Sequence, residues 1–235
     1  MIDIALIAIV AGVTYFVAQE GPWGAAFTLF SVIIAGLVAM NFFEPLANAL
    51  GNSMGFAWQT KVDIIALLGI FSLIVFLMRM GTDALMPTYV EVHGLLWDIG
   101  RWALGAATGY VVMAIVLTSL HTAPLPREFA GFTPERGNFF NMAPDRQWLA
   151  FVQYVSEKSF SAGPGGQVFD YSDESTPGTP PGWQFATFPI RYAHRREMSA
   201  GGGGFAPATA PGPVTPVAPG GAGPAPAGGS RGGGF

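Results

Sequence analysis

Apolar residues are concentrated in four long runs in the first half of the chain, and short polar breaks separate the runs. The runs contain no Lys, Arg or Glu, and the only Asp among them, Asp3, stands at the start of the first. A bilayer core about 30 Å thick needs about 20 apolar residues of α-helix at about 1.5 Å rise per residue. The pattern therefore predicts an all-α membrane protein with four spanning helices. These are expected at about residues 2–18, 25–43, 64–80 and 102–120.

Aromatic and basic side chains flank the apolar runs. Trp favours the headgroup layer, and a long Arg side chain can extend its charge from the end of a helix into that layer. Arg79 directly follows the third run, so the third helix is expected to continue through Met80; because this run is the shortest, a tilted or only partly spanning helix is an alternative. The interfacial anchors predicted on this basis are Trp23, Arg79, Trp97, Arg101 and Trp102.

The two longer breaks between runs are expected to stay outside the apolar core of the bilayer. Residues 44–62 start with Glu-Pro and have room for one interfacial turn, and residues 81–101 are too short and too charged for another span. The second of these segments is expected to lie along the membrane surface.

The second half of the chain is more polar, and residues 121–198 are expected to form an extramembrane region. Within it, Pro144 and Asp145 suit the first turn of a helix, and Trp148, Phe151 and Val152 recur on one face. A short amphipathic helix is predicted over about residues 144–158. This helix either lies in the membrane interface or packs on the protein's own loops.

The end of the chain has a different composition. Residues 199–235 are almost entirely Gly, Ala and Pro, with one charged residue, Arg231. Such a segment cannot bury enough apolar surface to offset its conformational entropy. A disordered low-complexity tail is predicted.

Overall composition agrees with a membrane location and limits the function classes. Hydrophobic residues make up 51% of the chain and charged residues 11%, against about 25% charged in ordinary soluble domains. The net charge of -4 supplies no basic field for nucleic acid, which is not expected as a partner. The absence of Cys excludes disulfides and thiolate metal sites. The lipid bilayer is the first expected partner.

Few residues suit catalysis, ion transport or metal binding. Proton relays and ion-coupled transporters place ionisable groups inside the membrane, and the predicted spans carry none beyond Asp3 and Arg79 at their ends. His93, His121 and His194 are scattered without a zinc motif and are expected to be exposed at the interface. No Gly-x-Ser-x-Gly sequence is present. We expect no enzyme activity, no metal and no cofactor.

One small-residue pair stands out on the fourth predicted helix. Gly105 and Gly109 are four residues apart, so another helix backbone could approach closely at this position, within this chain or from a partner. The alternative interpretation is that Gly is simply common in membrane helices. Gly36 and Gly69 have no comparable partner in the sequence.

The first half of the chain resembles the colicin V production protein family, the CvpA-like integral membrane proteins. The resemblance is carried by Asp3 at the start of the first helix, by Gly21 and Gly24 in the first break, and by the Leu-Gly-Ala-Ala-Thr-Gly sequence of residues 104–109. It implies a bacterial inner-membrane protein required for toxin production or export and for envelope maintenance. It also favours termini outside the cytoplasm, with residues 121–235 in the periplasm.

Two function classes follow from these observations. In the first, the protein is a structural or assembly component that packs its helices with other membrane proteins or with itself. In the second, it is an oligomeric pore or transporter subunit for a small or uncharged solute.

Overall fold

The computed structural model describes residues 2–54, 58–85, 94–126, 128–133, 138–158, 188–189 and 192–193. This part of the chain forms five α-helices, and the predicted all-α fold is confirmed. The helices are α1 (Ile2–Ala18), α2 (Gly21–Met54), α3 (Gln59–Leu85), α4 (Leu95–Thr122) and α5 (Pro144–Lys158). The low-complexity tail predicted over residues 199–235 lies outside the described residues.

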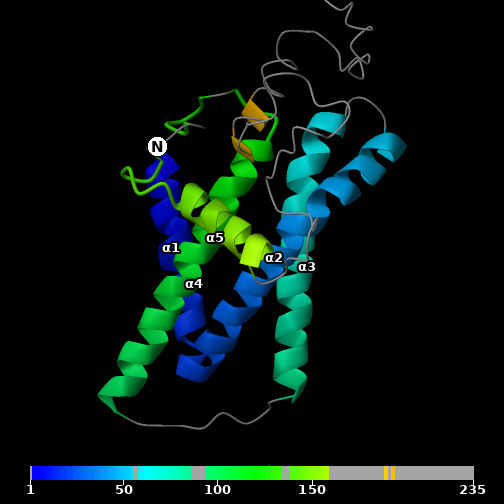
Figure 1. Ribbon diagram of the computed structural model, residues 1–235. Helices are drawn as coiled ribbons and strands as arrows, with labels where there is room; N and C mark the ends of the chain where they lie inside the picture. The colour runs from blue at the N-terminus through cyan, green and yellow to red at the C-terminus, as the bar shows by residue number, and fades with distance from the viewer. Residues whose placement is uncertain are drawn as a thin grey trace, which may run out of the picture.

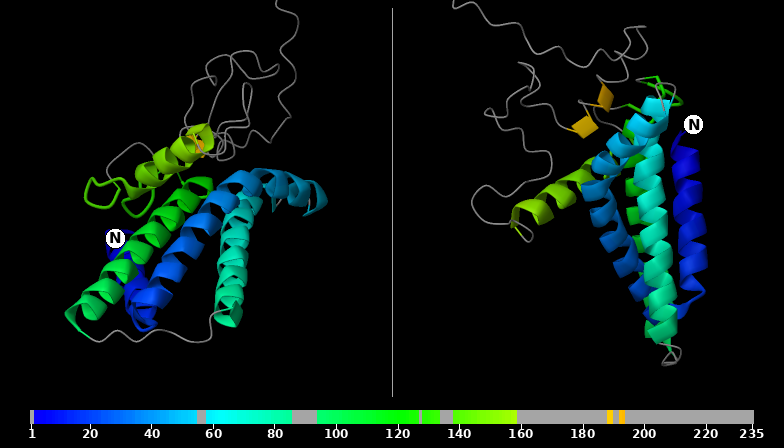
Figure 2. Two further views of the ribbon diagram at one scale, coloured as in Figure 1. Left: turned by 60° about the horizontal axis from the view of Figure 1, so that its bottom comes forward. Right: turned by 90° about the vertical axis from the view of Figure 1, so that its right-hand side faces the viewer.

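Four helices run up and down beside one another, and the fifth crosses them (Figure 1). α1 lies along α4, α2 packs between α3 and α4, and α5 lies obliquely over α4. The start of α1, the end of α4 and the α2–α3 connection are at one end of the bundle, which we call the upper end. The end of α1, the start of α2, the end of α3 and the start of α4 are at the other, lower end (Figures 1 and 2).

Three of the helices are long and apolar enough to cross a membrane by themselves. They contain the candidate spans Gly21–Gly51, Lys61–Leu85 and Trp97–Thr122, whereas α1 is a shorter apolar helix of 17 residues. The third run, predicted to be the short one, is thus part of a long helix. The first is short, but at about 1.5 Å per residue α1 reaches about 26 Å, near the lower limit for a spanning helix.

Three of the helices, α2, α3 and α4, are longer than the apolar runs that predicted them, whereas α1 has the predicted bounds. α2 continues through Pro45 to Met54, although a break was expected from Glu44 onward. A Pro ring removes one backbone hydrogen bond and usually bends a helix. α2 changes direction in its upper part, as Figure 2 shows, and so leaves the bundle without ending.

The segment expected to lie on the membrane surface is also largely helical. α3 extends to Leu85 and α4 begins at Leu95, so most of residues 81–101 prolong these two helices at the lower end. Residues 86–93 between them lie outside the described part of the chain.

The charged side chains of α1 to α4 and their turns lie at two levels, one near each end of the bundle. About 20 residues of α4 separate Arg101 from His121, or about 30 Å of helix, which matches the apolar core of a bilayer. The lower level contains Glu20, Arg79, Asp83, Asp98 and Arg101, and the upper level contains Asp3, Glu44, Lys61, Asp63 and His121.

Large apolar side chains face outward between these two levels. Phe30 of α2 is 60% exposed, and Leu73 and Phe76 of α3 are 57% and 62% exposed. α3 is the most peripheral of the three long helices, with 17% of its span buried. Apolar exposure of this extent is the surface expected to contact lipid tails.

Candidate functional site

Gly105 and Gly109 of α4 face the backbone of α1 at close range. A Cβ atom at Gly105 would lie 2.9 Å from the carbonyl oxygen of Thr14, and one at Gly109 would lie 2.7 Å from that of Val10. The Thr14 hydroxyl also donates a hydrogen bond to the Gly105 carbonyl over 3.4 Å. Both glycines therefore face a helix of the same chain, and α1 occupies the surface that a partner helix would need.

A cluster of polar groups at the lower level links α3 to α2 and to the α1–α2 turn. The Arg79 guanidinium lies 3.0 Å from the Glu20 carboxylate and 3.3 Å from that of Asp83. Arg79 also donates to the Thr28 hydroxyl over 2.9 Å, and this hydroxyl donates to Glu20 over 3.0 Å. Arg79 was predicted to extend freely into the interface, but it connects α3 to the α1–α2 turn and to α2. The separation of 59 positions between Glu20 and Arg79 gave no sequence signal for the pair.

Two other predicted anchors also contact the protein itself. The Trp97 ring covers Gly21 at the α1–α2 turn, where a Cβ atom would lie 2.8 Å from the indole. Gly21 has a φ of 77°, a left-handed conformation that favours glycine. Arg101 pairs with Asp98 over 2.9 Å on the same helix.

The remaining predicted anchors are the two tryptophans Trp23 and Trp102. Their side chains are 52% and 43% exposed near the lower level, on α2 and α4 respectively. Exposed indoles at this height suit a headgroup layer.

At the upper level, His121 and Asp145 join the last turn of α4 to the first turn of α5. The His121 Nε2 atom lies 2.8 Å from the Asp145 Oδ2 atom, and the two side chains are 0% and 1% exposed. The helix dipoles favour a cation at the end of α4 and an anion at the start of α5, so both termini support this pair. The prediction that His121 is an exposed interfacial residue is wrong; His93 and His194 lie outside the described residues.

The next contact between α5 and the bundle is the Trp148 ring, which fits against Gly36 of α2. A Cβ atom at Gly36 would lie 2.5 Å from the indole of Trp148 and 2.7 Å from the Ile115 side chain. Gly36 thus has a close-packed contact, although it has no paired small residue in the sequence. Trp148 lies 112 positions away and outside the predicted spans, so the spacing of small residues in the sequence does not indicate this contact.

Phe188 and Tyr192, from the second half of the chain, also pack onto α2. The Phe43 ring lies 6.1 Å from the Phe188 ring and 6.3 Å from the Tyr192 ring. The Tyr192 hydroxyl donates to the Glu44 carboxylate over 3.2 Å. The upper surface of the bundle is therefore covered by two different parts of the second half of the chain.

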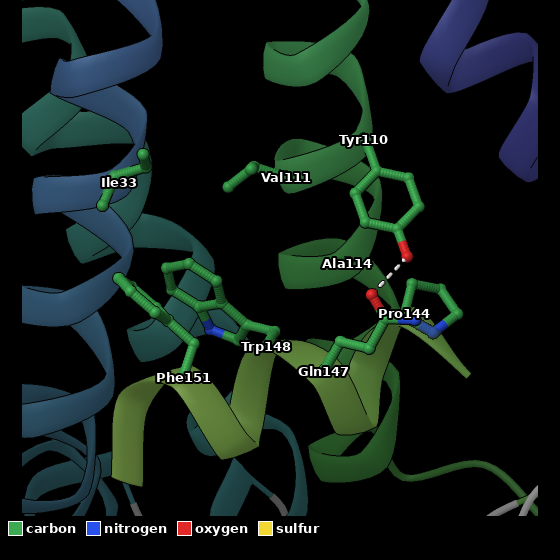
Figure 3. Close-up of a pocket in the computed structure, with 8 residues that line it drawn as sticks. All are labelled: Ile33, Tyr110, Val111, Ala114, Pro144, Gln147, Trp148 and Phe151. Atoms are coloured by element: carbon green, nitrogen blue, oxygen red, sulfur yellow. Dashed lines mark hydrogen bonds between the residues drawn. The ribbon is translucent and has the colours of Figure 1, made fainter. Parts of the chain in front are cut away.

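An apolar recess remains beneath α5, between α2 and α4 (Figure 3). Its volume is about 200 Å³. The Tyr110 hydroxyl donates to the Gln147 side-chain oxygen over 2.8 Å at one edge, and the rest of the lining is apolar. The lining residues are Ile33, Tyr110, Val111, Ala114, Pro144, Gln147, Trp148 and Phe151.

The fold and these contacts define a polytopic α-helical membrane protein. The family model for the colicin V production protein matches residues 2–136, more than half of the chain. The chain belongs to this family, as its sequence suggested. Neither the curated proteins nor the solved structures contain a match to it.

The close contact between α4 and α1 predicts a specific pattern of substitution effects. Gly109→Ala places a Cβ atom against the backbone of α1 and should lower the free energy of unfolding by about 1 to 3 kcal/mol, as overpacking does. Gly12→Ala and Gly69→Ala are matched controls, because nothing lies within 4 Å of either position. These two should be neutral or stabilising, since Ala is the better helix former. Unfolding in detergent, followed by circular dichroism, measures the difference, and equal stability of all three variants would contradict the packing described.

The polar cluster at the lower level predicts energetic coupling between α3 and the α1–α2 turn. A double-mutant cycle of Glu20→Gln and Arg79→Met should give a coupling of about 0.5 to 1 kcal/mol, modest because both groups are partly exposed. The coupling should decrease as salt is added. The control is the same cycle with Arg101→Met, whose ion pair with Asp98 lies within α4. The assignment of the contact between Glu20 and Arg79 would be refuted in two cases. Glu20 could show no coupling to Arg79, or it could show the same coupling to Arg79 and to Arg101.

Proposed function

We propose that the protein is a structural or assembly component of the bacterial inner membrane, acting in production or export of colicin V-type toxins or in envelope maintenance. Membership of the family supports the biological setting. The observation that carries the structural role is that several hydroxyl groups of the spans bond within their own helices, while large apolar side chains face outward between the two levels. Such a surface suits a helical unit that sits in lipid and associates with other membrane proteins.

The hydroxyl groups of the spans illustrate this internal use. Ser31 donates to the Phe27 carbonyl, Thr108 to that of Leu104 and Thr118 to that of Ala114, each four residues earlier on the same helix. A pore or transporter for an uncharged solute would need such groups turned toward a shared water path. No contact in the described part of the chain favours that alternative, and we propose no catalytic activity.

We further propose that the upper end of the bundle faces the periplasm. Arg79 and Arg101 flank the connection between α3 and α4 at the lower end, and short connections with Lys or Arg favour the cytoplasmic side. In the sequence, the upper side has an equal number of basic residues close to the spans, Lys61 and Arg127, so the resemblance to the family is what favours this orientation. Residues 121–235 would then extend from the periplasmic end.

The assembly role predicts specific partners in native membranes. Crosslinking in cells, followed by purification of the tagged full chain, should recover the same membrane proteins in repeated experiments. Replacement of both Gly105 and Gly109 by Leu should reduce this recovery at equal expression, because the module that presents the partner surface is distorted. Gly12→Leu is the control and should leave recovery unchanged.

Two results would count against the assembly role. One is that crosslinking recovers no specific protein. The other is that the purified chain forms stable oligomers and carries small uncharged solutes across liposomes, which would favour the pore.

The proposed orientation predicts the behaviour of reporters fused after Phe235. A reporter active only in the cytoplasm should give no signal in intact cells, and one active only in the periplasm should give full signal. The same pair inserted between α3 and α4 should give the reverse result. A cytoplasmic signal from the C-terminal fusion would overturn the orientation without affecting the assembly role.

A further inference from the structure

The recess beneath α5 lies near the middle of the apolar part of the bundle. Tyr110 on its wall is nine residues from Arg101 at the lower level and eleven from His121 at the upper level, or about 13 and 16 Å along α4. Ile33 on the opposite wall occupies a similar height on α2, between Glu20 and Glu44. The recess is therefore at the depth of lipid tails.

The walls and the roof of the recess come from different parts of the fold. Figure 3 shows Ile33 of α2 and Val111 of α4 on the two walls, with Trp148 and Phe151 of α5 directed toward them. Phe151 is 39% exposed, so the recess is not sealed on the α5 side. An amphipathic helix at a membrane interface buries its apolar face at the boundary between headgroups and acyl chains, where acyl chains can reach it.

Two of the polar side chains that line the recess have partners. The Tyr110 hydroxyl donates to Gln147, and the Gln147 side-chain amide donates to the Met142 carbonyl over 2.9 Å. The Trp148 Nε1 atom is buried without a partner in the described part of the chain. Apart from this one N–H group, the side chains of the lining leave an occupant little to gain from polar groups of its own. The chemistry of the lining selects hydrocarbon over a sugar, an ion or a peptide.

Volume also limits the occupant. A cavity of about 150 Å³ with Leu, Ile and Phe walls stays dry and holds one benzene molecule. The recess, at about 200 Å³, accommodates one segment of a single alkyl chain. It is too small for a second helix.

We propose that the recess beneath α5 is a binding site for one acyl chain of a membrane phospholipid, which the protein retains in preference to the lipid around it. The chain lies between α2 and α4 and contacts the underside of α5 through Trp148 and Phe151. The bound lipid thereby helps to hold α5 against the bundle. This inference rests on the recess and on its depth, and not on the proposed assembly role.

The test uses the full chain in liposomes of phosphatidylethanolamine and phosphatidylglycerol with a trace of phospholipid that carries a photoreactive group in mid-chain. After irradiation, mass spectrometry maps the adducts. Adducts at Ile33, Val111 and Phe151 should exceed those at the exposed Phe76 of α3 several-fold. Phe76 contacts bulk lipid and so gives the background level of labelling.

Two substitutions from opposite walls test occupancy of the recess. Val111→Phe and Ile33→Phe each add a ring to the space and should reduce adducts there several-fold while leaving those at Phe76 unchanged. Leu73→Phe, the matched control on the exposed face of α3, should change neither. Circular dichroism shows whether each variant is folded. If one variant is not folded, the ratio of adducts in the recess to adducts at Phe76 in the wild-type protein still tests the proposal.

Three outcomes would overturn the proposal. The first is labelling of the recess no greater than that of Phe76. The second is labelling that neither filling substitution reduces. The third is a retained molecule that native mass spectrometry identifies as something other than a phospholipid.

Discussion

The exclusion of charge from the central part of four helices is the constraint on which the rest of the structure depends. A charged side chain in the middle of a bilayer costs at least about 3 kcal/mol, and every backbone polar group there must bond within the protein. The charges of α1 to α4 are accordingly confined to two levels about 30 Å apart, and the Ser31, Thr108 and Thr118 side chains bond to carbonyl groups of their own helices. Lipid is as apolar as the side chains that face it, so the hydrophobic effect cannot hold these helices together.

The helices are held together by close packing and by a few polar contacts at the two levels. α1 is the shortest of the four helices α1 to α4, and it is fixed to α4 by backbone contact at Gly105 and Gly109. The upper end of α1 is held by a hydrogen bond of 3.0 Å from the Ile2 amide to the Ala130 carbonyl. Just past its lower end, Glu20 is held by its contact with Arg79. α5 is held in the same two ways, by the buried pair of His121 with Asp145 and by the fit of Trp148 against Gly36.

This arrangement gives the two halves of the protein different roles. The membrane module bonds several of its hydroxyl groups internally and presents large apolar side chains to its surroundings. The upper end carries the parts of the chain that reach beyond the membrane, and α5 joins the two. A lipid chain held beneath α5 would make that junction sensitive to the composition of the membrane.

The sequence was enough to locate the four membrane helices, because the exclusion of charge makes each of them visible as a continuous apolar run. It underestimated the lengths of α2, α3 and α4, since polar residues such as Asp83 and Asn48 continue a helix beyond the bilayer without any change of backbone. The pair Gly105 and Gly109 was visible as a local spacing. The contacts of Gly36 with Trp148, of Glu20 with Arg79 and of His121 with Asp145 join distant positions, and neither spacing nor composition encodes such pairs.

The central claim is that all four helices cross the membrane, including the short α1. The chain has no cysteine, so single substitutions can be labelled from one side with a thiol reagent that does not cross the bilayer. Asp3→Cys and Ser53→Cys should react from one side, and Gln19→Cys and Leu95→Cys only from the other. Reaction of Asp3→Cys and Gln19→Cys from the same side would show that α1 does not cross and would contradict the four-span architecture.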